Sequence, residues 1–291
     1  ELFSRPGRGR PAGLPSGPGG AGNCPRVRPA VLPALLPASA PRRIRTKGAT
    51  SAPMSPPFEC LDRVFIPQMR KMGPSVKARL ERCGFNGRGG GSILVEITPS
   101  QRLSFLEVEN TCRLQTTSIY ILHHNLRPGL PEMEAEFLPG KLWGEYALAE
   151  GMQEFFDQHF QGGVRLMPVP PALAPAEGSC NVIFMESIFA RGTRISCAYG
   201  GTSLKSAEKA ATELAGRRAY YAGYEGNVDR FLADQLIVPL AVGSGGRFSC
   251  QKPSGHTETC MELLRLFGGE VRAEPGRLPR EWVVTVDGPG S

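Results

Sequence analysis

The chain has 291 residues, with 34 Lys and Arg against 27 Asp and Glu, and 41% of its residues are apolar. This composition excludes a chain that is disordered throughout, and the length allows two domains of ordinary size. No stretch approaches the roughly 20 consecutive apolar residues that a membrane helix needs, so we expect no integral membrane protein. The net charge of +7 would by itself favour an anionic partner such as a nucleic acid.

The basic excess lies at one end of the chain. Residues 1–57 contain nine basic side chains and one acid, a net of 9 − 1 = +8, which leaves 25 bases and 26 acids, a net of −1, for the remainder. The same segment holds 12 Pro and 8 Gly, a composition that does not bury a core. We therefore interpret residues 1–46 as a disordered Pro/Gly/Arg-rich leader, in preference to a transit peptide or an RNA-binding arm. Removing them is expected to leave nucleotide binding intact.

Apolar spacing predicts the elements that follow. We expect a helix from Leu61 to Met72, then strands at 76–81 and 93–97 around a glycine run. The later expectations are a helix at 146–160, strands at 181–189 and 194–199, a helix at 206–221, a helix from 228 toward 242 capped by Asn227, a strand at 247–250, a helix capped by Thr257, and a strand at 282–286. Interleaved helices and strands predict a mixed α and β class.

Most motifs that suggest chemistry have a simpler explanation. The run Gly87-Arg88-Gly89-Gly90-Gly91-Ser92 lacks the Lys-Ser/Thr pair and the following helix of a P-loop, so we interpret it as a connection between strands. The eight cysteines show no zinc-site spacing and are interpreted as reduced thiols of an intracellular protein. Surface or packing roles are favoured for His123, His124 and His159.

His256 lies between Gly255 and Thr257, directly before the first turn of a predicted helix. Free amides at such a position attract phosphate and favour neutral imidazole, which is the nucleophilic form. A histidine placed there could accept a phosphoryl or nucleotidyl group, although spacing alone favours a capping or loop role.

Gln235 follows Phe231 by four residues and so shares the apolar face of its predicted helix. Together with Asp234 it places polar groups beside a buried seam, and buried polar groups need partners. A ligand is one candidate, and a hydrogen bond to the backbone within the core is the common alternative.

Four ordered blocks resemble the RNA 3'-terminal phosphate cyclase family. They are Gly48-Ala49-Thr50 with Pro53-Met54-Ser55-Pro56-Pro57, Gly84-Phe85 with Arg88-Gly89-Gly90-Gly91, the run from Phe231 to Ala241, and the run from Lys252 to Thr259. The resemblance covers about Lys47 to the C-terminus. It implies an α/β (α+β) fold of repeated units, each of two helices on a four-stranded sheet, with a smaller α/β domain inserted before the last repeat.

On this resemblance we expect residues 47–103 to form the first part of the core, 104–200 the inserted domain and 201–291 the last repeat of the core. The family's first repeat is expected to be missing. The family's E-G-G-G-Q block, whose acid is implicated in metal binding, does not occur in the sequence. We therefore expect the 291-residue polypeptide to be poorly soluble or inactive as it stands.

The resemblance also implies an activity and a set of site residues. The family's enzymes are ATP-dependent ligases that convert an RNA 3'-phosphate to a 2',3'-cyclic phosphate through a histidine–AMP intermediate, with a divalent metal, Mg²⁺ or Mn²⁺. By position in the motifs, His256 matches the nucleophile, and nucleotide contacts are expected from Phe231, Leu232, Ala233, Asp234 and Gln235. No metal ligand is assigned. RNA 3'-phosphate ends and ATP are the expected partners, in the cytoplasm or, in a eukaryote, the nucleus.

Three substitutions depart from the family pattern. Cys60 stands where an aromatic residue is usual, Phe231 replaces a tyrosine, and Gly87 replaces a proline. An alternative function is that of a non-catalytic cyclase-like protein of ribosome assembly, which keeps the fold and lacks the nucleophile. The presence of His256 within an H-x-x-T sequence favours the enzyme. A fragment without independent function is the third possibility.

Overall fold

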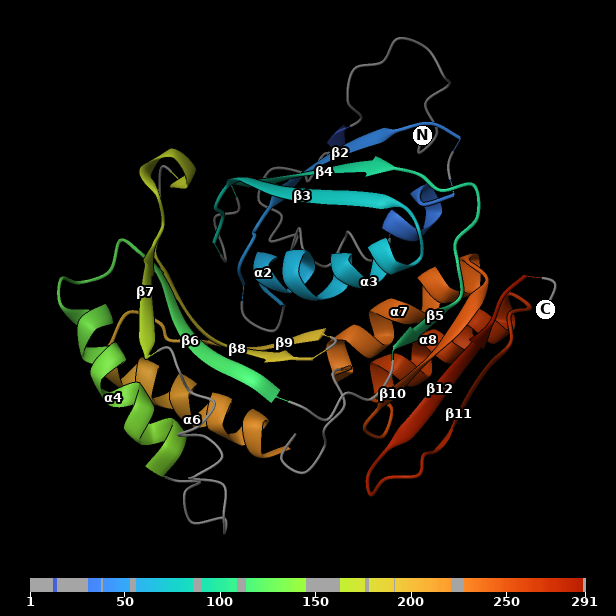
Figure 1. Cartoon of the computed structure of the whole chain (residues 1–291). Coiled ribbons are helices and arrows are strands. Elements are labelled where there is room, and N and C mark those ends of the chain that lie inside the picture. Colours follow the sequence, from blue (N-terminus) through green and yellow to red (C-terminus); the bar gives the residue numbers. More distant parts are fainter. Residues whose placement is uncertain are drawn as a thin grey trace.

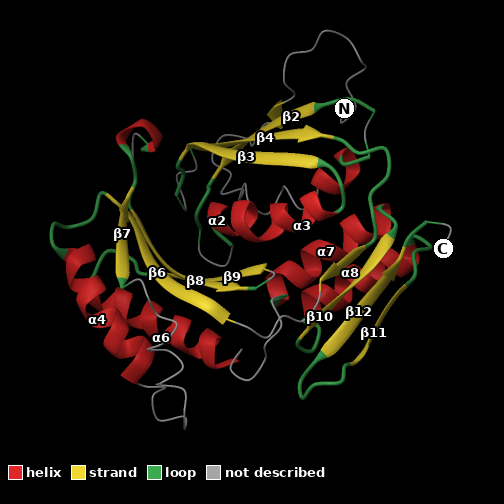
Figure 2. Ribbon diagram, in the orientation of Figure 1, coloured by secondary structure: helices red, strands yellow, loops and turns green. Residues whose placement is uncertain are grey.

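The computed structural model describes residues 13–14, 31–37, 39–52, 56–85, 90–108, 114–144, 163–175, 178–190, 192–220 and 228–289. These residues form three four-stranded sheets, each with helices packed on one face (Figure 2). The mixed α and β class is confirmed. No helix in these parts of the chain combines the length and the apolarity needed to cross a membrane.

The first sheet has the strand order β1-β2-β4-β3. Its strands are β1 (Gly13–Leu14), β2 (Arg42–Gly48), β3 (Ser75–Arg82) and β4 (Gly91–Thr98), and β4 pairs antiparallel with both β2 and β3. One helical segment made of α2 (Phe58–Cys60), the π-helix η1 (Leu61–Phe65) and α3 (Ile66–Lys71) covers one face of this sheet (Figure 1). The side chains of Phe65, Ile66 and Met69 on this segment are fully buried, and the helix predicted there is confirmed.

The prediction of a disordered leader was wrong for part of residues 1–46. Residues 31–35 form a short helix whose Leu32, together with Leu36 just beyond it, is fully buried in the main core. Strand β2 lies inside the sheet, between β1 and β4. The Pro, Gly and Arg content of the whole segment hid two local patterns, an apolar run at 31–36 and the alternation of Ile44 and Thr46 with arginines.

The second sheet has the order β7-β6-β8-β9. Its strands are β6 (Leu114–His124), β7 (Val164–Pro168), β8 (Cys180–Phe189) and β9 (Gly192–Tyr199), and a 3-10 turn, η2 (Pro171–Leu173), follows β7. Helices α4 (Leu130–Gly144) and α6 (Leu204–Tyr220) pack on one face around Ile119, Ile121 and Ile183. The strands predicted at 181–189 and 194–199 are confirmed, whereas the helix predicted at 146–160 lies entirely outside the described residues.

The third sheet has the order β11-β12-β10-β5. Its strands are β5 (Leu106–Val108), β10 (Gly245–Cys250), β11 (Val271–Pro275) and β12 (Trp282–Asp287). Helices α7 (Arg230–Val242) and α8 (Gly255–Leu266) lie against it, and Phe248, Leu236 and Val284 fill the space between helices and strands. The predicted strands at 247–250 and 282–286 are confirmed.

The sheets group the chain differently from the predicted domain ranges at two places. Strand β5 lies within the range expected for the inserted domain, yet it pairs in parallel with β10 of the third sheet. Helix α6 lies in the range expected for the last repeat, yet it packs against α4 and β9 of the second sheet. The remaining domain limits stay predictions.

The three sheets with their helices meet around the segment 58–71. Its π-helical part contacts β9 of the second sheet and α7 of the third, while α3 and η1 contact β3 of the first (Figure 1). This meeting point positions the candidate site.

Candidate functional site

Helix α7 is held at its start by a buried carboxylate. Asp229 is the N-cap, and its Oδ1 accepts hydrogen bonds from the amides of Phe231 (2.9 Å) and Leu232 (2.8 Å). The prediction that the helix starts at Val228 behind an Asn227 cap was wrong, because the chain becomes helical only at Arg230. Burial raises the pKa of Asp229, and the amide hydrogen bonds oppose this effect. Such a cap stabilises a helix end by about 1 kcal/mol.

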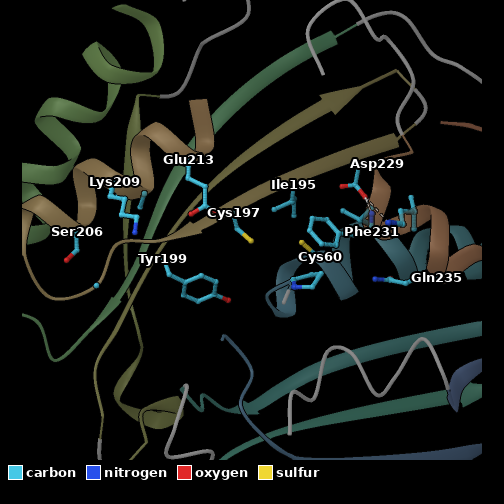
Figure 3. A pocket seen from close by; sticks show the side chains of 15 residues that line it. Cys60, Ile195, Cys197, Tyr199, Ser206, Lys209, Glu213, Asp229, Phe231 and Gln235 are labelled. Atoms are coloured by element: carbon cyan, nitrogen blue, oxygen red, sulfur yellow. Dashed lines mark hydrogen bonds between the residues drawn. The ribbon is translucent and has the colours of Figure 1, made fainter. Parts of the chain in front are cut away.

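Each sheet with its helices is called a unit below, numbered as the sheets are. A cavity of about 470 Å³ lies where the three units meet. Pro56, Cys60 and Val64 contribute one wall from the first unit, and β9 and α6 of the second unit contribute a further wall (Figure 3). The wall from the third unit contains Asp229, Phe231, Leu232 and Gln235. A volume of this size is typical of sites for small molecules and cofactors.

The cavity has an aromatic end, where Phe231 lies with the polar side chains of Asp229 and Gln235, and a charged end on α6 (Figure 3). The side chains of Cys60 and Phe231 lie at one end, and those of Lys209 and Glu213 project from α6 at the other (Figure 3). Burial raises the pKa of the Cys60 thiol and of the Tyr199 hydroxyl, so both groups are neutral at physiological pH. A ligand with a flat apolar part and a polar part matches this division.

Phe231 offers a flat surface to the cavity. The guanidinium of Arg230 lies over the Phe231 ring, 4.8 Å from its centroid, and helps to hold the ring in place. Gln235 lies one helical turn further along the same wall, where its amide can donate to and accept from a ligand. An aromatic face beside an amide is a suitable combination for binding a heterocyclic base.

The five predicted contact residues do not all face this cavity. Phe231, Leu232 and Gln235 line it, whereas Ala233 lines a small hollow against Ser254 and Thr257 at the start of α8. Asp234 is half-buried, and burial together with the charge of Asp234 raises the pKa of Cys260 on α8. The run is divided because it is helical, so that successive side chains point about 100° apart.

His256 is exposed on the first turn of α8 and does not line the cavity. The N-cap of α8 is Ser254, whose hydroxyl accepts from the amide of Thr257 (3.2 Å). The prediction that Thr257 caps the helix behind His256 was therefore wrong, since Thr257 is the third helical residue and fully buried. The Thr259 hydroxyl donates to the carbonyl oxygen of Gly255 (2.7 Å) within the same turn.

The start of α8 can still hold an anion beside His256. In a helix capped in this way, the amides of Gly255 and His256 have no acceptor within the helix. They carry the positive end of the helix dipole at the side chain that the motif marks as the nucleophile. Helix α8 packs against α7, so the two predicted motifs lie on neighbouring helices.

Comparison with known proteins decides the family. The family model described as RNA 3'-terminal phosphate cyclase matches residues 5–272. The chain belongs to the RNA 3'-terminal phosphate cyclase family. Because the match begins at residue 5, it includes most of the segment that composition assigns to a leader.

Individual relatives in this cyclase family agree. The chain is 31% identical over 222 residues to the RNA 3'-terminal phosphate cyclase of Koribacter versatilis, which is 76% of the chain and 57% of the relative. It is 30% identical over 250 residues to the proteins of the same name from Ectopseudomonas mendocina and Ralstonia nicotianae, which is 86% of the chain and 67% and 66% of the relatives. The chain thus spans between 57% and 67% of the length of these cyclases.

Several residues of the cavity in this cyclase-family chain carry no motif. Asp229 could have been found, because Asp before an apolar helical run is a favoured N-cap. Ser206, Lys209, Ala210 and Glu213 recur at helical spacing on one face of α6, but the sequence does not indicate what that face meets. Tyr199 follows the alternation of β9 and has no signal of its own.

The described residues test the divalent metal that the cyclase resemblance implies. Nowhere among them do three or more His, Cys, Asp or Glu side chains come together as ligands.

The remaining cysteines and histidines follow the sequence interpretation where they are described. Cys60, Cys83, Cys180, Cys197, Cys250 and Cys260 are free thiols. His123 and His124 are half-buried at the end of β6, and the His124 ring packs 5.7 Å from that of Phe85. His159 lies outside the described residues.

Proposed function

We propose that this protein carries the nucleotide-binding cavity and the nucleophile of an ATP-dependent RNA 3'-phosphate cyclase. One observation carries the proposal: two family motif blocks, far apart in the sequence, meet at one cavity. Pro56 belongs to the Pro-Pro block and Cys60 comes three residues after it, and Phe231 and Gln235 belong to the α7 block. Family membership supports a functional role for this meeting, because these blocks carry the resemblance to the cyclases.

The reaction follows from the resemblance. A ring nitrogen of His256 attacks the α-phosphorus of ATP and expels pyrophosphate, which leaves AMP on the histidine. An oxygen of the RNA 3'-phosphate then attacks that phosphorus and takes AMP from His256. The neighbouring 2'-hydroxyl, losing its proton, attacks the 3'-phosphorus and expels AMP, which closes the 2',3'-cyclic phosphate. This chemistry belongs to the ATP-dependent ligase class.

The residues divide the work by position. Phe231 and Gln235 hold the adenine in the cavity, with Cys60 opposite in place of the family's usual aromatic residue. Ser254 organises the first turn of α8 and leaves the amides of Gly255 and His256 for the transferred phosphate. A divalent metal, Mg²⁺ or Mn²⁺, stays an expectation of the resemblance, as does a cytoplasmic or nuclear location.

A binding experiment tests the cavity. We expect the chain to bind ATP, measured with a fluorescent ATP analogue or by calorimetry. Phe231→Ala and Gln235→Ala should each weaken binding by about tenfold, because each removes a contact of roughly 1.4 kcal/mol. Val238→Ala, at an exposed position of the same helix, is the matched control and should bind as the parent does. Absence of ATP binding in a folded parent would refute the proposed function.

A labelling experiment tests the nucleophile. With ATP labelled at the α-phosphate, we expect binding without transfer in the 291 residues, because the E-G-G-G-Q block is not among them. A stable label that His256→Asn abolishes would overturn this expectation of inactivity and establish His256 as the acceptor. In a longer protein that supplies the block, the absence of any label would instead favour the non-catalytic ribosome-assembly alternative, and a label that persists in His256→Asn would show that another residue accepts AMP.

A further inference from the structure

The first sheet has one covered face and one open face. Residues 31–36 and the helical segment 58–71 pack against the side that holds Val76, Ile93 and Val95. Alternate side chains of the same strands point the other way. In the part of the chain that the structure describes, no helix covers this second side, which faces away from the cavity (Figure 1).

The open side is basic. Its long side chains are Arg43, Arg45 and Lys47 on β2 and Lys77 and Arg79 on β3, and we call these five residues the basic sheet face. Two acids, Glu81 and Glu96, share that side, as does Arg82, which pairs with Ser92 beyond a bulge, so six bases against two acids give a net charge of +4. Of the nine bases at 1–57, four lie on β2. Three of these four point to the open side, which they share with the bases of β3.

Cross-strand register arranges these charges in rows. Arg43, Glu96 and Lys77 are opposite one another on β2, β4 and β3, and Arg45, Leu94 and Arg79 form the next row. Arg45 binds Glu81 with two hydrogen bonds of 2.8 and 2.9 Å, and Arg43 pairs with Glu96 at 2.8 Å. These pairs hold both arginines across the sheet, while Lys77 and Arg79 are exposed.

The chemistry of this surface selects a backbone rather than a base. The outer positions of β4 are Ser92, Leu94, Glu96 and Thr98, so neither they nor the basic sheet face provide an aromatic ring for stacking. Lys and Arg in rows about 6.6 Å apart along each strand can instead contact successive phosphates. Binding through phosphates is independent of sequence and depends strongly on salt.

We propose that the basic sheet face binds the phosphate backbone of RNA, away from the end that occupies the cavity. The choice of RNA among polyanions rests on the proposed function, which supplies RNA as the substrate. The charge and geometry of the face do not depend on that function. The face would hold the body of the substrate while its 3' end reaches α7 and α8.

Salt-dependent RNA binding tests this proposal. The probe is a short 5'-labelled RNA with a 3'-hydroxyl, in two different sequences, and its binding to the full chain is followed by fluorescence anisotropy over a range of salt. We expect the double variant Lys77→Gln with Arg79→Gln to make the negative slope of log K against log salt shallower by about two, equally for both sequences. Arg277→Gln with Arg280→Gln, at exposed positions between β11 and β12, removes the same charge elsewhere and should leave the slope unchanged.

Other outcomes would overturn the proposal. They are an unchanged slope in the Lys77 and Arg79 variant, an equal loss in the control, or a loss of binding to only one sequence. Tighter binding of polyglutamate or of phosphatidylserine vesicles than of RNA would assign the face to an acidic protein or a membrane instead. ATP binding is measured on the same variants: if the parent binds RNA through this face but no ATP, the proposed function fails and the basic sheet face stands.

Discussion

At the scale of single residues, the least expected group is a buried acid on α4. Glu134 is completely buried, and the side-chain amide of Asn181 on β8 donates to its Oε1 (2.6 Å). Burial raises the pKa of Glu134 from about 4.5 to about 7. Asn181 also crowds Gly200, where an added Cβ would come within 2.5 Å of its amide, and Gly201 lines the cavity. The sequence shows an acid on a helix and cannot show that it is buried.

Glu134 predicts a pH dependence of stability. The folded chain keeps the carboxyl proton until about pH 7, whereas the unfolded chain releases it near pH 4.5. The folded state therefore binds more protons between these values, so stability falls as pH rises from 4.5 to 7 and stays low above that. Glu134→Gln mimics the neutral acid. Relative to the parent, it should gain up to about 3 kcal/mol in free energy of unfolding between about pH 5 and about pH 8.

Urea denaturation at the two pH values measures this gain. Glu136→Gln, at an exposed position of the same helix, is the matched control and should shift stability equally at both. A Glu134→Gln variant whose difference from the parent does not change with pH would show that the carboxylate is ionised in the folded protein.

At the scale of elements, local periodicity predicts most of the helices and strands and fails where average composition conceals it. Strand β2 and the short helix at 31–35 lie in a segment rich in Pro, Gly and Arg. Leu36 is fully buried, and its carbonyl oxygen accepts a hydrogen bond from the amide of Ser100 (3.2 Å). Strand β2 buries Thr46 beside Ile44 while turning arginines outward. Composition describes a whole segment, whereas strand formation depends on side chains two residues apart.

Truncating Leu36 tests whether this segment belongs to the core. Leu36→Ala should lower the free energy of unfolding by about 3 kcal/mol, through lost transfer energy and the cavity left behind. Leu35→Ala makes the same chemical change at a half-buried neighbour and should cost clearly less. Equal small losses in urea denaturation would return the segment to the status of a leader.

The expected effect of deleting residues 1–46 is reversed by the same packing. Deletion would remove the core residues Leu32 and Leu36 and most of β2, a strand of the sheet against which the segment 58–71 packs. That segment supplies Cys60 and Val64 to the cavity wall. We now expect the deletion to weaken nucleotide binding.

At the scale of the whole molecule, a charge pair links two units. Arg63 on η1 donates to Oε1 of Glu186 on β8 (3.0 Å), and the Tyr120 hydroxyl donates to Oε2 of the same carboxylate (3.2 Å). Glu186 is buried, whereas the Arg63 side chain is 39% exposed. The pair joins the helical segment of the first unit to the second sheet, next to the cavity they share.

A double-mutant cycle on Arg63 and Glu186 measures this link. Alanine at both positions, singly and together, should give a coupling free energy of about 1.5 kcal/mol, because the hydrogen bonds involve a buried charge. The pair Arg43 and Glu96 has a similar distance, 2.8 Å, but its side chains are 72% and 45% exposed. Its coupling should stay below about 0.5 kcal/mol. Equal coupling in the two cycles would contradict a structural link between the units.

The sequence by itself determined the mixed α and β class, the family resemblance, the placing of Gln235 on a helix, and the closeness of His256 to the start of another. These features depend on residues close together in the sequence, through helical and strand periodicity and through motif spacing. Only the tertiary structure decided that β2 belongs to a sheet, and that a cavity between the three sheets takes Phe231 and Gln235 but leaves His256 on the neighbouring helix. Those outcomes depend on contacts between residues far apart in the chain, which no local pattern encodes.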